Sequence, residues 1–360
     1  MSDAAAILLT GAFAAVACAL LGTFLLLRGM SLVGDAISHA VLPGIVVAFL
    51  ITKSVSAVPV VLGAAAVGLL TVFLIESLVR TRRVKEDASI AVVFPALFAA
   101  GVLLLARFVD QKDLDLDCVL YGEITFAGLD TISVLGLELS RPMLVLGGTA
   151  LLNLAFVALL YKELGLATFD ASLAAAVGIS PLLVHYLLMG AVSVTTVASF
   201  ESIGAILVVA FLVVPAAAAH LLTDRLGLML ATAAGIGVAS AVVGYHAATA
   251  LNASIAGSMA AAMGGFFVLA WLFAPRQGVI GRMLVRRRAR ERIALALVLA
   301  RLVRAPAARD RIVADLSWPR ARIDTVLATL EAEDLVEVVE GGEALRPTRR
   351  GLEFVAGVVG

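Results

Sequence analysis

This 360-residue chain has few residues that could carry out covalent or redox chemistry. It contains two cysteines, four histidines and four lysines, and only 15% of its residues are charged. Cys18 and Cys118 show neither metal-ligand nor redox spacing. No lysine follows a glycine, and neither His-Glu-x-x-His nor Gly-x-Ser-x-Gly occurs. A phosphate-binding P-loop is therefore absent, and the sequence argues against an ATPase, an intramembrane metalloprotease and a lipid hydrolase.

Apolar residues, by contrast, are abundant. They make up 62% of the chain, and the mean hydropathy is +1.06, against about 45–50% apolar residues in an ordinary soluble domain. Apolar runs of roughly 20 residues can cross a bilayer as helices. Such runs are Ala4–Leu27, Leu32–Thr52, Val55–Val79, Ala88–Ala106, Met143–Tyr161, Leu182–Ser199, Ile203–Leu222, Leu226–Leu251 and Ile255–Phe273. They predict an all-α polytopic membrane protein with about eight or nine transmembrane helices.

The first of these runs has no positively charged segment before it. We therefore expect a membrane helix there and not a cleaved signal peptide. The positive residues from Arg80 to Lys85 place the connection that contains them in the cytoplasm, under the positive-inside rule. An outside N-terminus and a cytoplasmic C-terminus follow from this placement.

Charged residues are distributed unevenly along the chain. Of the 27 Lys and Arg residues, 15 follow residue 280, together with 11 of the 27 Asp and Glu residues. The composition therefore predicts a transmembrane domain over residues 1–278 and a cytoplasmic domain over residues 286–360. The basic run Arg286–Arg290 is expected to flank the membrane and to contact anionic lipid headgroups.

The segment 286–360 has the pattern of a small α+β domain. Predicted helices over Arg290–Arg304, Ala307–Asp315 and Arg320–Glu331 are followed by an apolar strand and a Gly-Gly turn. A helix-turn-helix with a hairpin predicts a winged helix, with its wing over Leu335–Gly351. The segment resembles the N-terminal domain of metal-dependent repressors of the diphtheria-toxin-repressor type.

Binding of DNA by such a domain would require base-reading residues on its second helix. That helix offers Arg320 and Arg322, but acidic residues are close to them in the sequence. The net charge after residue 280 is 15 − 11, or +4, which is a weak electrostatic footprint for nucleic acid. We therefore favour a regulatory or protein-contact module, and nucleic acid binding through residues 286–360 is the less favoured alternative.

One ionisable pair lies inside a predicted membrane span. Asp35 and His39 are four residues apart, so they lie on one face of a helix. A central Asp in a membrane helix costs about 2.5 to 3.5 kcal/mol, so such residues usually face a cavity, a partner or a transported ion. A carboxylate and an imidazole are half of a transition-metal site, and two subunits would supply four ligands. The alternative is a polar hydrogen bond between helices.

The other ionisable candidates have more ordinary explanations. His185, His220 and His246 lie near the ends of predicted spans, where an interfacial imidazole or a hydrogen bond to a carbonyl group is sufficient. Glu201 is predicted to begin a helix, whose N-terminal dipole would stabilise a carboxylate. A position in the lining of a pore is the alternative for Glu201.

One connection between spans is predicted to contain a short helix. Asp170 is its expected N-cap, an alanine-rich body follows, Gly178 is the expected C′ residue, and Pro181 lies beyond it. A short helix between two spans is suited to docking onto a soluble partner. A plain connector would give the same helix signals.

Three segments carry a family resemblance. Leu25–Gly44, Ser199–Ala219 and Thr168–Gly178 resemble the two signatures and the cytoplasmic coupling loop of the manganese/zinc/iron permease family of bacterial ABC importers. The resemblance extends over essentially residues 5–275. It implies a type II importer in the bacterial cytoplasmic membrane, with two permease subunits, an ABC ATPase and an extracytoplasmic metal-binding protein. The second permease subunit would be a copy of this chain or a paralogue.

The resemblance also implies roles for individual residues. It places Asp35 and His39 in the metal pathway. The residues that it assigns to coupling with the ATPase are Asp170, Leu173, Ala174, Ala175 and Gly178. We therefore predict a permease subunit, and not an enzyme, that moves Mn, Zn or Fe into the cytoplasm and has no permanently bound cofactor. The alternative is a membrane-tethered, metal-responsive regulator that acts through its winged helix.

Overall fold

The computed structural model describes residues 2–52, 57–108, 124–134, 137–274, 278–339 and 344–359. Cys118 and Gly341-Gly342, the expected turn of the wing, lie outside these ranges. The chain divides into two compact units, Met1–Ala274 and Pro275–Gly360. Each unit is described by itself below.

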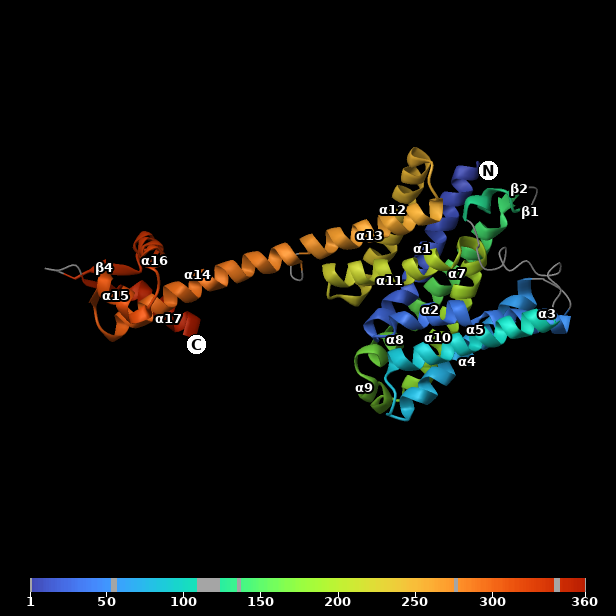
Figure 1. Cartoon of the computed structure of the whole chain (residues 1–360), viewed down its shortest axis with the longest axis horizontal. Helices are drawn as coiled ribbons and strands as arrows, with labels where there is room; N and C mark the ends of the chain where they lie inside the picture. Colours follow the sequence, from blue (N-terminus) through green and yellow to red (C-terminus); the bar gives the residue numbers. More distant parts are fainter. Residues whose placement is uncertain are drawn as a thin grey trace. The chain divides into compact units, whose positions relative to one another are not determined.

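The first unit is a bundle of membrane-spanning helices (Figure 1). In the described part of the chain, nine segments are long and apolar enough to cross a membrane. They are α1 (Asp3–Leu27), α2 with α3 (Ser31–Ala40 and Leu42–Thr52), α4 (Ala57–Arg80), α5 (Glu86–Phe108), α7 (Arg141–Leu159), α10 (Pro181–Ile203), α11 (Ala205–Leu222), α12 (Leu226–Leu251) and α13 (Ile255–Phe273). The prediction of a polytopic all-α membrane protein is confirmed.

The second span departs from the single helix expected over Leu32–Thr52. It consists of two helices, α2 and α3, which meet at Val41. Pro43 explains the break, because it has no N–H group to bond to the carbonyl group of His39 one turn earlier. The Pro43 ring packs closely on α5, where a Cβ atom added to Gly101 would lie 2.7 Å from the proline Cδ. The break therefore lies in the interior of the bundle and directly follows the turn that carries His39.

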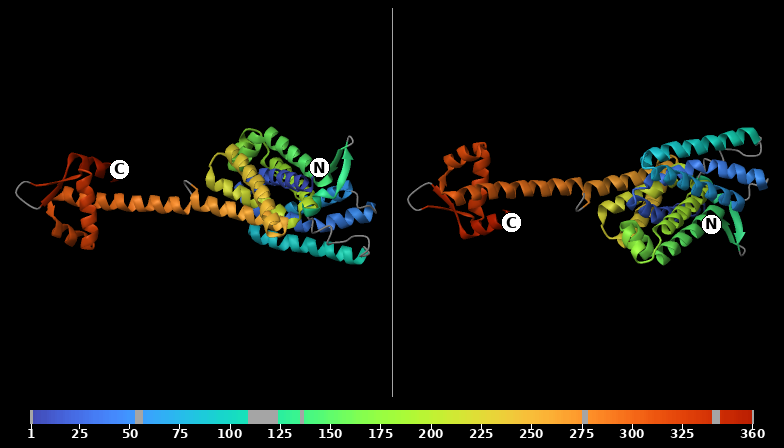
Figure 2. Two further views of the ribbon diagram at one scale, coloured as in Figure 1. Left: turned by 90° about the horizontal axis from the view of Figure 1, so that it is seen from above. Right: turned by 90° about the horizontal axis from the view of Figure 1, so that it is seen from below.

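The broken span is also the most enclosed of the nine. Its buried share is 72%, against 17% for the span Ile255–Phe273. Helix α2 packs against α4, α5, α10 and α11. Helix α1, dark blue in Figure 2, packs against α7, α11 and α12. Glycines allow two of the close approaches between helices, because Gly22 faces the backbone of Leu212 and Gly44 faces that of Gly63. The helix that carries Asp35 and His39 is thus at the centre of the unit.

Short elements mark the two ends of this bundle (Figure 1). At the end that holds the N-terminus, the 3-10 helix η1 (Ile124–Gly128) is followed by an antiparallel hairpin of β1 (Thr131–Val134) and β2 (Leu137–Ser140), with Thr131 opposite Ser140. At the other end lie α8 (Tyr161–Phe169) and α9 (Ala171–Ala176). We call these the hairpin end and the α9 end. Helix α9 corresponds to the short helix expected from the sequence, whereas α8 was not predicted.

The second unit is a small helical domain with a three-stranded sheet. It contains α14 (Val279–Arg304), β3 (Ala307–Ala308), α15 (Arg309–Leu316), α16 (Arg320–Ala332), β4 (Val336–Val338), β5 (Ala344–Pro347) and α17 (Arg349–Val359). The sheet is antiparallel in the order β3-β5-β4. Its core joins Leu299 and Leu302 of α14 to Ile312 of α15, to Ile323 and Leu330 of α16 and to Leu345 of β5. One core therefore unites three of the four helices with the sheet.

Two features of the second unit differ from the sequence-based expectation. Residues 349–351, expected to end the wing, instead begin α17, which continues to Val359. The helix expected over Arg290–Arg304 begins at Val279, so the basic run Arg286–Arg290 lies within α14. Both errors arise from helix formation beyond a boundary that had been placed at charged residues.

Candidate functional site

Asp35 and His39 lie together on α2, as their spacing predicts. The His39 Nε2 atom is 3.5 Å from Asp35 Oδ1. The imidazole ring also lies against Phe94 of α5, with 5.9 Å between ring centroids. Three residues separate the end of α1 from the start of α2. Because α2 begins at Ser31, Asp35 lies in its second turn and His39 in its third.

The pair remains open within a single chain. The side chains of His39 and Asp35 are 44% and 40% exposed, although their neighbours on α2, among them Ala36, Ile37 and Ser38, are buried. Among the described residues, no group of three or more His, Cys, Asp or Glu side chains could hold a metal ion. One chain therefore offers two ligands with free space beside them, which is half of a four-ligand site.

A second carboxylate and imidazole pair lies between α4 and α10. The His185 Nε2 atom is 3.1 Å from Glu76 Oε1, without the geometry of a hydrogen bond. The other oxygen of Glu76 accepts hydrogen bonds from Tyr186 at 2.7 Å and from Arg80 at 3.2 Å. Arg28 and Arg80 both act electrostatically on His185. This carboxylate is already neutralised by a cation, so the pair is a structural link and a poor metal site.

The segment that contains α9 has the expected caps. The Asp170 carboxylate accepts hydrogen bonds from Ser172 Oγ at 2.6 Å and from the Leu173 amide at 2.9 Å. These two bonds, from the Ser172 hydroxyl first and the Leu173 amide second, lower the pKa of Asp170 below its usual value. Gly178 follows the helix with a φ of 88°, and the next amide, of Ile179, bonds back to the Ala174 carbonyl. The start and the end of α9 are therefore both fixed locally.

The exposure of the five residues implied to contact an ATPase is not uniform. Asp170, Leu173, Ala175 and Gly178 are exposed, whereas Ala174 is fully buried. Ala174 therefore seats α9 on the bundle and does not present a surface to a partner. Phe169 and Val177, which the sequence did not single out, are large exposed apolar side chains in the same segment as Leu173.

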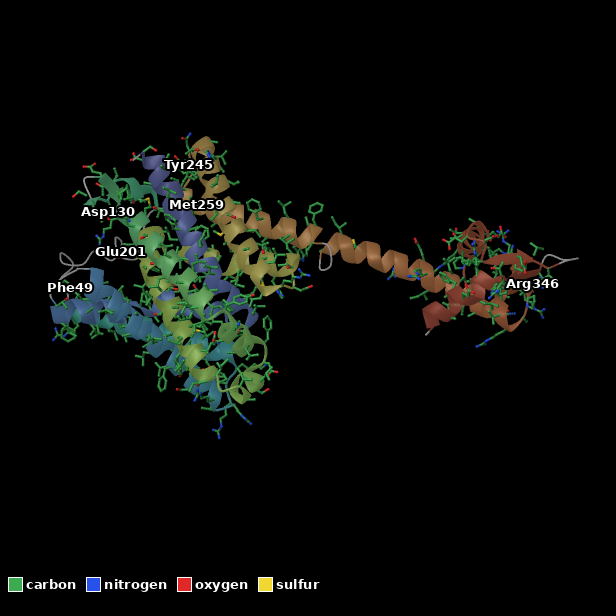
Figure 3. All side chains as sticks on the ribbon, turned by 180° about the vertical axis from the view of Figure 1, so that it is seen from behind. Phe49, Asp130, Glu201, Tyr245, Met259 and Arg346 are labelled. Atoms are coloured by element: carbon green, nitrogen blue, oxygen red, sulfur yellow. The ribbon has the colours of Figure 1, made fainter. Side chains whose placement is uncertain are left out.

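The position of Glu201 differs from the expectation. Glu201 lies in the last turn of α10, which ends at Ile203, and α11 begins only after Gly204. A helix C-terminus disfavours a carboxylate, so the dipole explanation was wrong. Arg141 compensates instead, with its guanidinium 3.7 Å from Glu201 and 4.0 Å from Asp130. Figure 3 labels Asp130 and Glu201 at the same end of the bundle. Glu201 lies near the C-terminal end of α10, whereas His185 lies near the start of that helix.

The two remaining histidines stay outside any cluster in the described structure. His220 lies in the last turn of α11, and His246 lies five residues before the end of α12. Both side chains are exposed on the surface of the single chain. Their positions agree with ordinary interfacial imidazoles.

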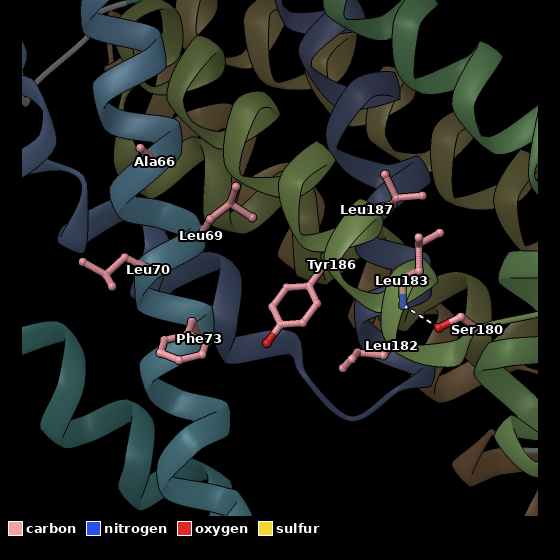
Figure 4. A pocket seen from close by; sticks show the side chains of 9 residues that line it. All are labelled: Ala66, Leu69, Leu70, Phe73, Ser180, Leu182, Leu183, Tyr186 and Leu187. Atoms are coloured by element: carbon pink, nitrogen blue, oxygen red, sulfur yellow. Dashed lines mark hydrogen bonds between the residues drawn. The ribbon is translucent and has the colours of Figure 1, made fainter.

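An apolar groove of about 860 Å³ lies between α4 and α10. Leu69, Leu70 and Phe73 line one wall, Leu183 and Leu187 line the other, and the Tyr186 ring lies between them (Figure 4). Neither Asp35 nor His39 lines it. A groove with this lining suits hydrocarbon and offers no ligands to an ion.

The chain is similar to known membrane transport proteins over its first unit. A profile of the ABC 3 transport family matches residues 4–274. The chain is 50% identical over 285 residues to the manganese transport system membrane protein MntD of Bacillus subtilis (strain 168), which covers 79% of this chain and 96% of that protein. It is 39% identical over 281 residues to the zinc transport system membrane protein TroD of Treponema pallidum (strain Nichols), with 78% and 77% covered.

A solved structure agrees with these sequence matches. The structure of PsaBC from Streptococcus pneumoniae in complex with Fab matches with a TM-score of 0.64 and 29% identity, over 77% of this chain and 94% of the matched chain. The family match takes in all nine candidate spans of the described structure and ends at the boundary between the two units. The chain therefore belongs to the ABC 3 transport family, and it is a membrane-spanning transport subunit of an ABC transporter, not an enzyme.

Proposed function

We propose that this chain is the permease subunit of an ABC importer that moves a divalent transition metal ion, Mn²⁺, Zn²⁺ or Fe²⁺, into the cytoplasm. The observation that carries the proposal is the open Asp35 and His39 pair on the most buried span of an ABC 3 family member. Similar proteins are named as manganese and zinc transport system membrane proteins. Mixed oxygen and nitrogen ligation tolerates all three metals, so the substrate is stated as this class.

A second permease subunit completes the site in this proposal. Two ligands from each of two subunits give two carboxylates and two imidazoles around a shared axis. The exposed sides of Asp35 and His39 are available for such an arrangement. The second subunit is another copy of this chain or a paralogue, and an extracytoplasmic metal-binding protein delivers the ion.

The α9 end is placed in the cytoplasm. The connections at this end carry Arg28, Arg80, Arg82, Arg83, Lys85, Lys162 and Arg225. At the hairpin end, the described connections and helix ends carry Arg107 and Arg141, and the sequence adds Lys53 and Lys112 in connections outside the described residues. This asymmetry follows the positive-inside rule and gives an outside N-terminus and a cytoplasmic second unit in a cell membrane.

A separate ABC ATPase docks on the α8–α9 segment in this proposal. Phe169, Leu173 and Val177 are large exposed apolar side chains of this segment, which an ATPase groove would bury. Asp170 and Gly178 hold the ends of α9, and Ala174 seats it on the bundle. Movement of this surface during ATP hydrolysis would alternate access to the metal site.

The second unit is proposed to be a winged-helix-like module that contacts protein and not nucleic acid. Its elements follow the order helix, short strand, two helices and a two-stranded wing, with β5 between β3 and β4. Five of the 15 arginines that follow residue 280 pair with carboxylates within the domain, and these pairs are Arg301 with Asp315, Arg309 with Asp324, Arg320 with Asp310, Arg346 with Glu337 and Arg349 with Glu353. Arginines held in this way are not free for phosphate contacts, which disfavours the regulator alternative.

Uptake of radioactive metal tests the proposal. Cells expressing the chain with its ATPase and binding protein would be compared with the Asp35→Ala and His39→Ala variants at matched membrane expression. We expect both variants to lose uptake, and the metal that is lost identifies the substrate. Asp87→Ala and His246→Ala are matched controls, because both side chains are exposed and neither residue lies on α2. Unchanged uptake of all three metals in the Asp35 and His39 variants would contradict the proposal.

A further inference from the structure

The connection between α1 and α2 is short and tightly bonded. It consists of Arg28, Gly29 and Met30. The Gly29 amide donates to the Leu26 carbonyl at 3.0 Å, and the Met30 amide donates to the Leu25 carbonyl at 2.9 Å. Gly29 has a φ of 75°, which favours glycine at this turn. A displacement of Arg28 is therefore passed to α2, since no slack chain separates them.

The Arg28 side chain contacts the α8–α9 segment at the α9 end of the bundle. Its Nε atom donates a hydrogen bond of 3.1 Å to Thr168 Oγ1, and the Thr168 hydroxyl in turn donates to the Leu164 carbonyl at 2.6 Å. Arg28 and Thr168 are 140 residues apart in the sequence. The hydrogen bond therefore joins two segments that have no covalent connection near this point.

Arg28 is poorly compensated in this conformation. Its second terminal nitrogen, Nη2, is buried without a hydrogen-bond partner, and in the described structure no carboxylate lies within ion-pair distance of it. Burial lowers the pKa of Arg28 below its ordinary value. A buried guanidinium with spare donors makes the remaining bond to Thr168 important, and it leaves donors available for a different partner in another conformation.

Thr168 lies close to the surface proposed to dock the ATPase. It is in the last turn of α8, two residues before Asp170, which caps α9. Asp170 holds the first turn of α9 through the Leu173 amide. A displacement of α9 therefore moves Thr168, and Thr168 holds Arg28.

We propose that Arg28 is a positioning residue that transmits movement of the α8–α9 segment to the metal helix α2. The path runs from α9 through Thr168 and Arg28 to the start of α2, one turn before Asp35 and two turns before His39. The proposal rests on the proposed function. It deepens that function by naming the contact through which ATP hydrolysis on the partner alters the metal site.

A second route leads from α9 through α10. Helix α10 follows α9 directly, and Tyr186 and His185 in its first turns contact Glu76 of α4. Glu76 joins α10 to α4, and both helices pack against α2, although neither carries the metal pair. The two routes therefore make different predictions, because loss of the Tyr186 hydroxyl leaves the Arg28 contact in place.

The test measures metal transported per ATP hydrolysed in liposomes that contain the full assembly with its ATPase and binding protein. We expect the Arg28→Gln and Thr168→Val variants to hydrolyse ATP while their transport per ATP falls about tenfold, within the roughly 5- to 150-fold range of typical coupling effects. The double variant should fall no further than the single variants, because both remove one contact. Thr168→Ser, which keeps the hydroxyl, should restore most of the ratio.

Matched controls separate this contact from general effects of charge or polarity. Arg83→Gln removes an exposed arginine at the same end, and Thr149→Val removes a hydroxyl that bonds only to its own helix. Tyr186→Phe tests the α10 route. An unchanged ratio in Thr168→Val, or an equal fall in the controls or in Tyr186→Phe, would overturn the proposal. If Arg28→Gln fails to assemble, Thr168→Val decides. A wild-type assembly that accumulates no metal would overturn the proposed function itself.

Discussion

The described part of the bundle contains two pairs of a carboxylate and an imidazole, and these pairs differ in their position, exposure and partners. Asp35 and His39 lie on one helix, are 3.5 Å apart and are 40% and 44% exposed. Glu76 and His185 lie on two helices, are 3.1 Å apart and are 22% and 13% exposed. Glu76 also binds Arg80 and Tyr186, whereas no described cation lies within ion-pair distance of Asp35.

The comparison shows that surroundings and not residue types decide what such a pair can do. A metal ion needs lone pairs that are free and a local charge that is negative. Asp35 has both, because among the described residues only the His39 imidazole lies within ion-pair distance of it. The Glu76 carboxylate accepts hydrogen bonds from the Tyr186 hydroxyl and the Arg80 guanidinium, so it stabilises the packing of α4 against α10.

The largest expected effect is on metal binding by the purified protein. We expect Asp35→Asn to weaken binding of Mn²⁺ or Zn²⁺ at least about 100-fold, because an amide carries no charge to balance the cation. Glu76→Gln should leave the affinity unchanged, because Glu76 is bonded to Arg80 and Tyr186 and is not one of the proposed ligands. Equilibrium dialysis or calorimetry measures both. Equal losses in the two variants would remove the distinction between the pairs.

A second effect is expected on stability, with the roles of the pairs reversed. Glu76→Gln removes the anion from beside Arg80 and His185, so we expect a loss of about 2 kcal/mol, below the value for a fully buried pair because Glu76 is partly exposed. Asp35→Asn should change stability by less than about 0.5 kcal/mol. Thermal denaturation in detergent of the two variants is the measurement. A larger loss in Asp35→Asn would show that the α2 pair is structural.

The smallest effects separate the two partners of Glu76. Tyr186→Phe loses one hydrogen bond to a half-buried carboxylate and should cost about 1 kcal/mol. Arg80→Gln removes an ion pair between residues four apart on α4, in which the guanidinium is largely exposed. We expect a loss of stability of less than about 0.5 kcal/mol. The same denaturation measurement ranks them. The reverse order would mean that Arg80 is the main partner of Glu76.

The sequence predicted well those features that depend on neighbours within a few residues. The nine spans were found from apolar runs alone, and the Asp170 and Gly178 caps of α9 follow from residue types at helix ends. The second span was predicted as one helix, although Pro43 was the signal for its break. Glu201 was assigned to the wrong helix, because the junction between α10 and α11 lies at Gly204, after Glu201 and not before it.

Other features could not be found in this way. His185 looked like an interfacial imidazole, and its contact with Glu76 arises only when α4 and α10 pack together. Ala174 and Ala175 are identical in sequence terms, yet one is buried and the other exposed. The face of α9 that meets the bundle is set by α8 and α10, which hold it in place.

The sequence by itself determined the membrane class, the spans and the placement of Asp35 beside His39, because helix geometry and transfer into lipid are local properties. The tertiary structure decided which of two similar pairs is open and which is neutralised. It also decided that Arg28 meets Thr168, 140 residues away. Such contacts depend on how helices pack, and packing joins segments whose distance in the chain carries no information about their distance in space.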